Sequence, residues 1–159
     1  MPQTRLLLVA ILAAVVGCAA RTTNPPSPAA SLRSSPEFAA LAYMMEQHAS
    51  FSQAERETYS AYVVPESPLG DAIVKAFANH TPPVSNSIKV DATSGEARNS
   101  SNGRPVKSWD AELVELNGDR AVVNVTWYSA SLAAGGHRVE LERRGGKWAV
   151  VQERMEWVS

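Results

Sequence analysis

After residue 35, the first half of the chain carries apolar residues at the three- and four-residue spacing of amphipathic helices. Ser35-Pro36 and Ser67-Pro68 are each typical of a helix start, because serine caps free backbone N–H groups and proline is accepted at the first helical position. Between them, Ser52 and Glu55 fit a capping box, which predicts a helix over 52–63. The pattern therefore predicts two or three helices.

The second half of the chain changes to the two-residue alternation of strands. Residues 117–119 (Asn-Gly-Asp) and 145–146 (Gly-Gly) supply turn residues. A short edge strand is predicted over 87–92, followed by a loop rich in Ser, Asn and Gly over 91–104. Four long strands are then predicted, at 106–116, 120–130, 137–144 and 148–158.

The register of the first long hairpin follows from which side chains share a face. A three-residue loop at 117–119 pairs Trp109 with Trp127 and gives one continuously apolar face. A two-residue turn would slip the pairing by one residue and exchange every side chain between the faces. We therefore predict the three-residue loop.

The last hairpin leaves two registers open. A two-residue glycine turn predicts that His137 faces Arg154 at the far end of the strands. The alternative is a bulge after Val151, which would turn Met155 and Trp157 inward.

Helices followed by a four-stranded meander predict an α+β fold. The expected architecture is two or three N-terminal helices packed on a curved antiparallel sheet of four to five strands, which together form a cone. We expect a single domain over residues 36–159, because this length is ordinary for one domain.

The N-terminus has the features of a secretory signal peptide over residues 1–17. A lone Arg5 precedes an unbroken apolar run over 6–16. This run is shorter than the roughly 20 residues that span a bilayer core. Residues 18–35 are rich in Pro, Ser, Thr and Ala, which predicts an extended tether.

Val15-Val16-Gly17-Cys18 resembles the lipobox of bacterial lipoproteins. The resemblance implies that the chain is cut before Cys18, and that acyl chains on Cys18 anchor the protein in a lipid bilayer. Ala19 stands where an aspartate would signal retention in the inner membrane. The resemblance therefore implies a protein of the outer membrane that faces the periplasm.

Composition argues against several partners and sites. The chain has a net charge of −1 and no block of basic residues, so nucleic acid is not an expected partner. Cys18 is the single cysteine, and its acylation leaves no thiol for a disulfide. The three histidines fall in separate predicted elements without metal-ligand spacing, and no glycine-rich phosphate loop is present. Neither a metal nor a cofactor is expected.

Gly146-Lys147-Trp148 with Val150, followed by Trp157-Val158-Ser159, is similar to the C-terminal end of many small bacterial proteins. Those proteins share the curved α+β cone of nuclear transport factor 2 and ketosteroid isomerase. The resemblance implies a pocket between the helices and the concave sheet face.

Such a pocket would need an acidic residue on its inner face to act as an isomerase. The predicted register points Asp110 and Glu112 outward and leaves Glu153 as the one candidate for an inward acid. No catalytic residue is assigned from the sequence.

The candidate binding site is a polar cluster at the open end of the sheet, formed by His137, Gln152 and Arg154 beside Ser129. Arg154 would give an anionic or hydroxylated ligand a charged donor. The alternative is that these side chains form only the solvated rim of the sheet.

Four tryptophans are numerous for a chain of this length. Trp109, Trp127 and Trp148 are expected in the core, where an indole N–H normally finds an acceptor. Trp157 lies near the terminus, and the sequence does not decide whether it belongs to the core. A row of tryptophans that binds sugar rings or a partner is the alternative.

The sequence leads to a first hypothesis of a non-catalytic, membrane-anchored module that binds a small ligand or an envelope protein. The alternative is an isomerase- or dehydratase-like enzyme that uses the cone pocket. Sheets of this kind often pair, so a homodimer is a further option.

Overall fold

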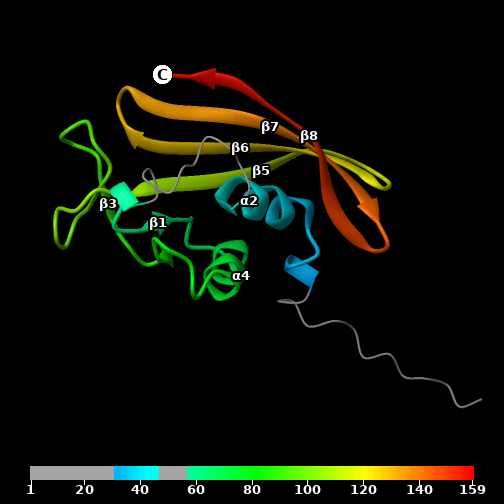
Figure 1. Cartoon of the computed structure of the whole chain (residues 1–159), viewed down its shortest axis with the longest axis horizontal. Helices are drawn as coiled ribbons and strands as arrows, with labels where there is room; N and C mark the ends of the chain where they lie inside the picture. The colour runs from blue at the N-terminus through cyan, green and yellow to red at the C-terminus, as the bar shows by residue number, and fades with distance from the viewer. Residues whose placement is uncertain (1–30, 47–56) are drawn as a thin grey trace, which may run out of the picture.

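The computed structural model describes residues 31–46 and 57–159, and Figure 1 shows how their elements are arranged. In chain order these are α2 (Pro36–Glu46), β1 (Tyr62–Val63), α4 (Pro68–Ala76), β2 (Val84–Ser85), β3 (Val90–Asp91), β4 (Arg98–Asn99), β5 (Lys107–Asn117), β6 (Arg120–Ala130), β7 (Ala133–Arg144) and β8 (Lys147–Val158). The cysteine at position 18, the predicted signal peptide and residues 18–30 of the predicted tether lie outside the described residues. Residues 31–35, the end of that predicted tether, form a short helical turn before α2 and are not extended.

The main sheet has six strands in the order β2-β1-β5-β6-β7-β8, and β3 pairs with β4 in a separate small sheet. The expected antiparallel sheet of four to five strands is therefore wrong. The sheet is mixed, because β1 runs parallel to both β2 and β5. The expected layer of two or three N-terminal helices is wrong as well, since strands predominate in the described residues, which include only the two short helices α2 and α4.

The extra strand β1 comes from the end of the predicted helix over 52–63. Residues 52–56 lie outside the described residues, residues 57–58 are helical, and Tyr62–Val63 is a strand. Aromatic and β-branched side chains fit a strand better than a helix. Both side chains of β1 are buried, in two different apolar clusters, so each face of this short strand is covered.

The two predicted helix starts are confirmed. The Ser35 hydroxyl accepts a hydrogen bond from the backbone N–H of Phe38 (3.2 Å) at the start of α2. The Ser67 hydroxyl accepts one from the backbone N–H of Gly70 (3.0 Å) at the start of α4. Each serine thus satisfies one of the free N–H groups of its helix.

The predicted pairing of β5 with β6 is confirmed, but the predicted loop is wrong. Trp109 lies opposite Trp127 as expected. The turn has two residues, Gly118 and Asp119, and a bulge at Val114 restores the expected register further along the strand. The positive φ of Gly118 (59°) suits it to this turn. The bulge and the shorter turn together give the same apolar face that the three-residue loop would give.

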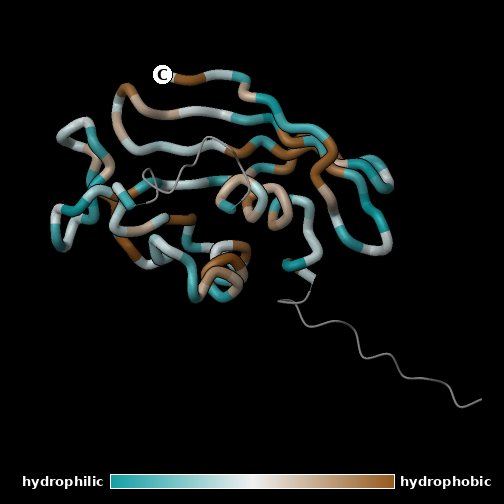
Figure 2. Tube along the Cα trace, viewed as in Figure 1, coloured by the Kyte–Doolittle hydropathy of each residue, from teal (hydrophilic) through white to brown (hydrophobic). Residues whose placement is uncertain are grey.

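The main core lies between the helices and one face of the sheet, which we call the helix-side face. Leu41, Met44 and Met45 of α2 and Ile73 of α4 pack there. They meet the inward side chains of the central strands, among them Val123, Val125, Val139 and Leu141. Figure 2 shows the apolar strand segments gathered where the strands cross beside α2. Core side chains around α2 occupy much of the space that the cone architecture would leave for a ligand, and a smaller cavity of about 220 Å³ remains beside Leu41, Leu69 and Ala111.

The opposite face of the sheet, which we call the outer face, is partly covered by residues 86–106, which we call the arm. Ala97 and Val106 of the arm pack with Val63 in a second buried cluster, against which Tyr128 of β6 is packed. The arm includes β3 and β4 and projects from the end of the sheet where β3 is labelled in Figure 1.

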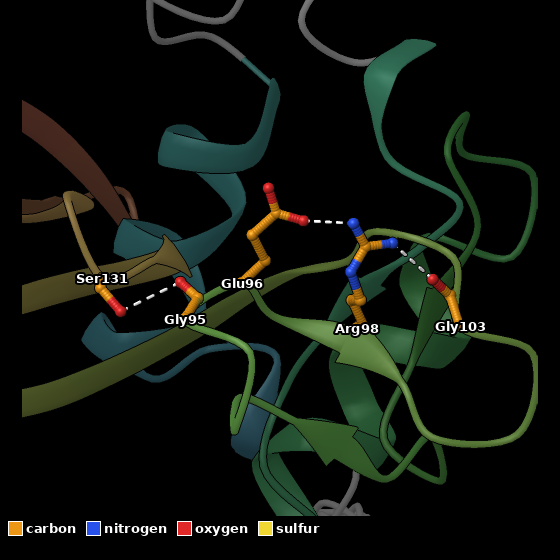
Figure 3. A network of polar contacts seen from close by, with 5 residues as sticks. All are labelled: Gly95, Glu96, Arg98, Gly103 and Ser131. Atoms are coloured by element: carbon orange, nitrogen blue, oxygen red, sulfur yellow. Dashed lines mark hydrogen bonds and ion pairs between the residues drawn. The ribbon is translucent and has the colours of Figure 1, made fainter.

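Polar contacts fasten the arm to itself and to the turn that follows β6 (Figure 3). The Ser131 hydroxyl donates a hydrogen bond to the Gly95 carbonyl (3.1 Å). Arg98 donates to the Gly103 carbonyl (2.7 Å) and forms an ion pair with Glu96. The arm therefore holds its position at one end of the outer face.

Candidate functional site

The structure separates the four residues of the predicted binding cluster. His137 is buried on the helix-side face with 2% of its surface exposed. Ser129 is also buried, and its hydroxyl donates to the Ala133 carbonyl (3.1 Å). Gln152 and Arg154 are exposed and lie beside Glu140 and Arg138 on the outer face. Only His137 and Ser129 point away from solvent.

A bulge in β8 separates Gln152 and Arg154 from His137, and a second bulge sets the position of Trp157. The first, at Val151, places Met155 opposite His137, so the expected pairing of His137 with Arg154 is wrong. This bulge is the alternative that the sequence left open. The second, at Glu156, moves Trp157 opposite Gly136. Trp157 therefore lies on the outer face, and not inward as that alternative predicted.

The first bulge also brings Glu153 inward to His137. The Glu153 carboxylate lies 2.5 Å from Nδ1 of His137, and Nε2 of the same ring lies 3.4 Å from the indole nitrogen of Trp127. An indole N–H can only donate, so Nε2 accepts and Nδ1 carries the proton that is shared with Glu153. Both ring nitrogens are thus engaged inside the protein.

Lys107 lies next to this group, buried among aromatic rings. Its Nζ is 4.2 Å from the centre of the Trp127 ring, and 5.3 and 5.5 Å from the rings of Trp109 and Tyr59. Such contacts stabilise a desolvated ammonium group. We call Lys107, Trp127, His137 and Glu153 the buried array. Its geometry connects β5, β6, β7 and β8 and suits a structural role.

A groove with a volume of about 650 Å³ lies on the outer face. Its floor includes the side of β5 and β6 that carries Ser108, Asp110, Thr126 and Tyr128. Residues 86–89 of the arm form a wall, and Trp157 lies at the β8 end. The sequence placed Asp110 on the outward face correctly, but it offered no sign that this face carries a groove.

One row of residues crosses four strands along this floor. Asp110 pairs with Thr126, Thr126 with Gly136, and Gly136 with Trp157. Neighbouring strands lie about 4.8 Å apart, so the row brings a carboxylate and an indole within reach of one small ligand.

Trp157 can lie against β7 because position 136 has no side chain. A Cβ atom at Gly136 would stand 2.1 Å from the indole nitrogen of Trp157. The indole is nevertheless 48% exposed, so one side of it rests on the strand while the rest is open. The Gly-Gly pair at 135–136 was the one signal in the sequence for this arrangement, because glycine inside a strand often marks close approach by another group.

Several polar atoms of the groove have defined partners. Asp110 accepts a hydrogen bond from the backbone N–H of Ala111 (2.8 Å), which fixes its carboxylate at the floor. Asn86 donates to Asp71 (2.7 Å) and holds the wall against α4. The Ser108 hydroxyl donates to the Tyr128 carbonyl (3.3 Å). The groove is therefore largely formed before any ligand arrives.

Metal ligation is not supported in the part of the chain that the structure describes, where no three His, Cys, Asp or Glu residues are grouped to hold an ion. None of the helices among residues 31–46 and 57–159 is both long and apolar enough to cross a membrane. Comparison with protein-family models, with characterised sequences and with solved structures finds no match.

Proposed function

We propose that the protein is a membrane-anchored binding protein of the cell envelope, and that its outer-face groove holds a small ligand. The groove is the observation that supports this proposal. Its volume of about 650 Å³ lies in the range of small-molecule sites, roughly 300–1,000 Å³. Its lining combines an exposed indole with hydroxyl and carboxylate groups, which is the mixture that orients a ligand.

The anchor rests on the lipobox-like segment at Val15–Cys18, outside the described residues. Acylation of Cys18 and a Pro/Ser-rich tether would hold the domain at a membrane surface. The groove would then face the compartment into which the signal peptide directs the chain.

The enzymatic alternative draws on the contact between Glu153 and His137, an acid and an imidazole on the helix-side face. A general base needs a nitrogen or oxygen that can reach a substrate proton. His137 is 2% exposed, and both of its ring nitrogens are engaged by Glu153 and Trp127. We therefore favour binding over catalysis.

A fragment screen by NMR tests the location of the site. The full chain is labelled with ¹⁵N and held in a detergent without a sugar headgroup, and a library of neutral, cationic and anionic fragments is added. We expect the shifted resonances to cluster at Ser108, Thr126, Tyr128 and the Trp157 indole. Shifts that cluster around His137, or a library without any binder, would contradict the proposal.

A further inference from the structure

We propose that the groove binds a neutral saccharide; this deepens the proposed function and rests on it. A pyranose ring has an apolar face of C–H groups and a rim of hydroxyls that both donate and accept hydrogen bonds. A matching site needs a flat aromatic surface with donors and acceptors of both kinds around it. The outer-face groove offers these parts.

The aromatic surface is Trp157. Its indole rests against the backbone of Gly136, where a Cβ atom would overlap with it, and 48% of the residue is exposed. An aromatic ring supported on one side and open on the other presents a large contact area at low entropic cost. The backbone of β7 thus sets the orientation of the platform, and the groove runs from it toward β5.

The polar groups around the platform match a hydroxylated ligand. Thr126 lies one strand away from Gly136 in the same cross-strand row, and its hydroxyl can donate or accept. Asp110 lies one strand further and offers carboxylate oxygens as acceptors. Tyr128 adds a phenol, which serves as donor and acceptor. The row covers roughly 10 Å from the platform at Gly136 to Asp110, so it extends beyond a single sugar ring.

The charges along the groove disfavour an anionic ligand and give a cationic one only a screened attraction. Asp110 and Glu66 line it with negative charge, and Lys89 lines it with positive charge. Asp110, Glu66 and Lys89 are all exposed, so water screens them. A phosphate or carboxylate would approach two acids, and an ammonium group would be attracted by these acids but repelled by the lysine.

The test uses six probes on the ¹⁵N-labelled full chain in a detergent without a sugar headgroup. Three are neutral trisaccharides: cellotriose, maltotriose and N-acetylated chitotriose. Three are non-saccharides of different charge: adenosine, phenethylamine and benzoate. The reporter is the indole N–H resonance of Trp157, which is assigned by its loss in Trp157→Phe.

We expect at least one trisaccharide to shift the Trp157 indole together with Thr126 and Tyr128. Trp157→Ala should weaken this binding about tenfold or more, as for a central aromatic anchor. Val158→Ala, which shortens an exposed neighbour on the same strand, should leave it unchanged. Asp110→Asn should weaken it only a few-fold, because an amide oxygen still accepts hydrogen bonds.

The outcomes separate the inference from the proposed function. If only phenethylamine, adenosine or benzoate shifts the groove resonances, the groove is a binding site and the saccharide inference is overturned. Trisaccharide binding that survives Trp157→Ala would overturn it too. If neither the six probes nor the fragment library shifts these resonances, both proposals fail.

Discussion

Gly135 and Gly136 each leave room for one indole, on opposite faces of β7. A Cβ atom at Gly135 would stand 2.8 Å from the Trp127 ring on the helix-side face, and one at Gly136 would overlap with Trp157 on the outer face. The two indoles differ in their freedom to move. Trp127 is packed against the core and contacts Lys107 and His137, whereas Trp157 is half exposed.

Alanine at each glycine should therefore have different effects. Gly135→Ala is expected to lower the free energy of unfolding by about 1–3 kcal/mol, because Trp127 cannot move without disturbing its neighbours. Gly136→Ala should cost much less, because Trp157 can swing toward solvent, but it should displace the indole from the groove. Urea denaturation measures the first effect, and the Trp157 indole resonance reports the second. Equal stability losses in both variants would contradict this account.

The contact between His137 and Glu153 is the second feature at the residue scale with a testable consequence. Glu153→Ala removes the partner of a buried ring nitrogen and should lower the free energy of unfolding by about 1–3 kcal/mol. Glu156→Ala is the matched control on the same strand. Glu156 forms an exposed ion pair with Arg154 (3.6 Å), which is worth about 0–1 kcal/mol. A loss as small as in the control would show that the buried array contributes little to stability.

The sequence predicted some of these residues and missed others for a physical reason. The two-residue period of a strand was enough to place Trp109 and Trp127 on one face. It could not place Trp157, and it named Glu153 only as a candidate inward acid, because the faces of both residues depend on the bulges at Val151 and Glu156. Bulges have no sequence signature as strong as that of a turn. The candidate cluster at His137, Gln152 and Arg154 was therefore predicted from a pairing register that β8 does not adopt.

At the scale of elements, the two helix starts and the two-residue glycine turn at 145–146 were the best-predicted features. At both helix starts the serine accepts a hydrogen bond from a backbone N–H only three residues later, as the caps of α2 and α4 show. Such local contacts can be recognised from the sequence alone. The strand β1 was missed because its two residues gain their strand conformation from distant partners in β2 and β5. Tertiary pairing of this kind cannot be inferred from local periodicity.

The cap of α4 gives the prediction for this scale. Ser67→Ala removes the acceptor for the Gly70 N–H and should lower the free energy of unfolding by about 0.5–2 kcal/mol. Ser94→Ala, at an exposed position of the arm, is the control and should have an effect within about 0.5 kcal/mol. Thermal or urea unfolding of both variants provides the comparison. A Ser67→Ala protein as stable as the control would show that the cap does not stabilise α4.

At the scale of the whole molecule, the two faces of the sheet have different roles. The helix-side face is packed against α2 and α4 and provides the main core. The outer face is covered only in part by the arm, and the groove lies in the uncovered part. The cone architecture expected from the sequence did not include the arm as a second layer, so it gave no sign of a groove on the outer face.

Anchoring is the prediction that concerns the full chain. Cys18→Ser removes the thiol that would be acylated, so the variant should leave the membrane fraction of its native host or keep its uncleaved signal peptide. Ala20→Ser is the control and should stay with the membranes. Mass spectrometry of the wild-type product should show an acylated N-terminal cysteine. A wild-type protein with a free thiol at position 18 would contradict the proposed anchor.

The position of Trp157 on the outer face is the central claim, because the groove, its aromatic platform and the proposed ligand all depend on it. The most direct measurement is the set of nuclear Overhauser effects from the Trp157 indole N–H in the full chain. The account predicts strong cross-peaks to the Hα protons of Gly136. Cross-peaks to the rings of Trp127 and His137 would place the indole on the helix-side face and contradict it.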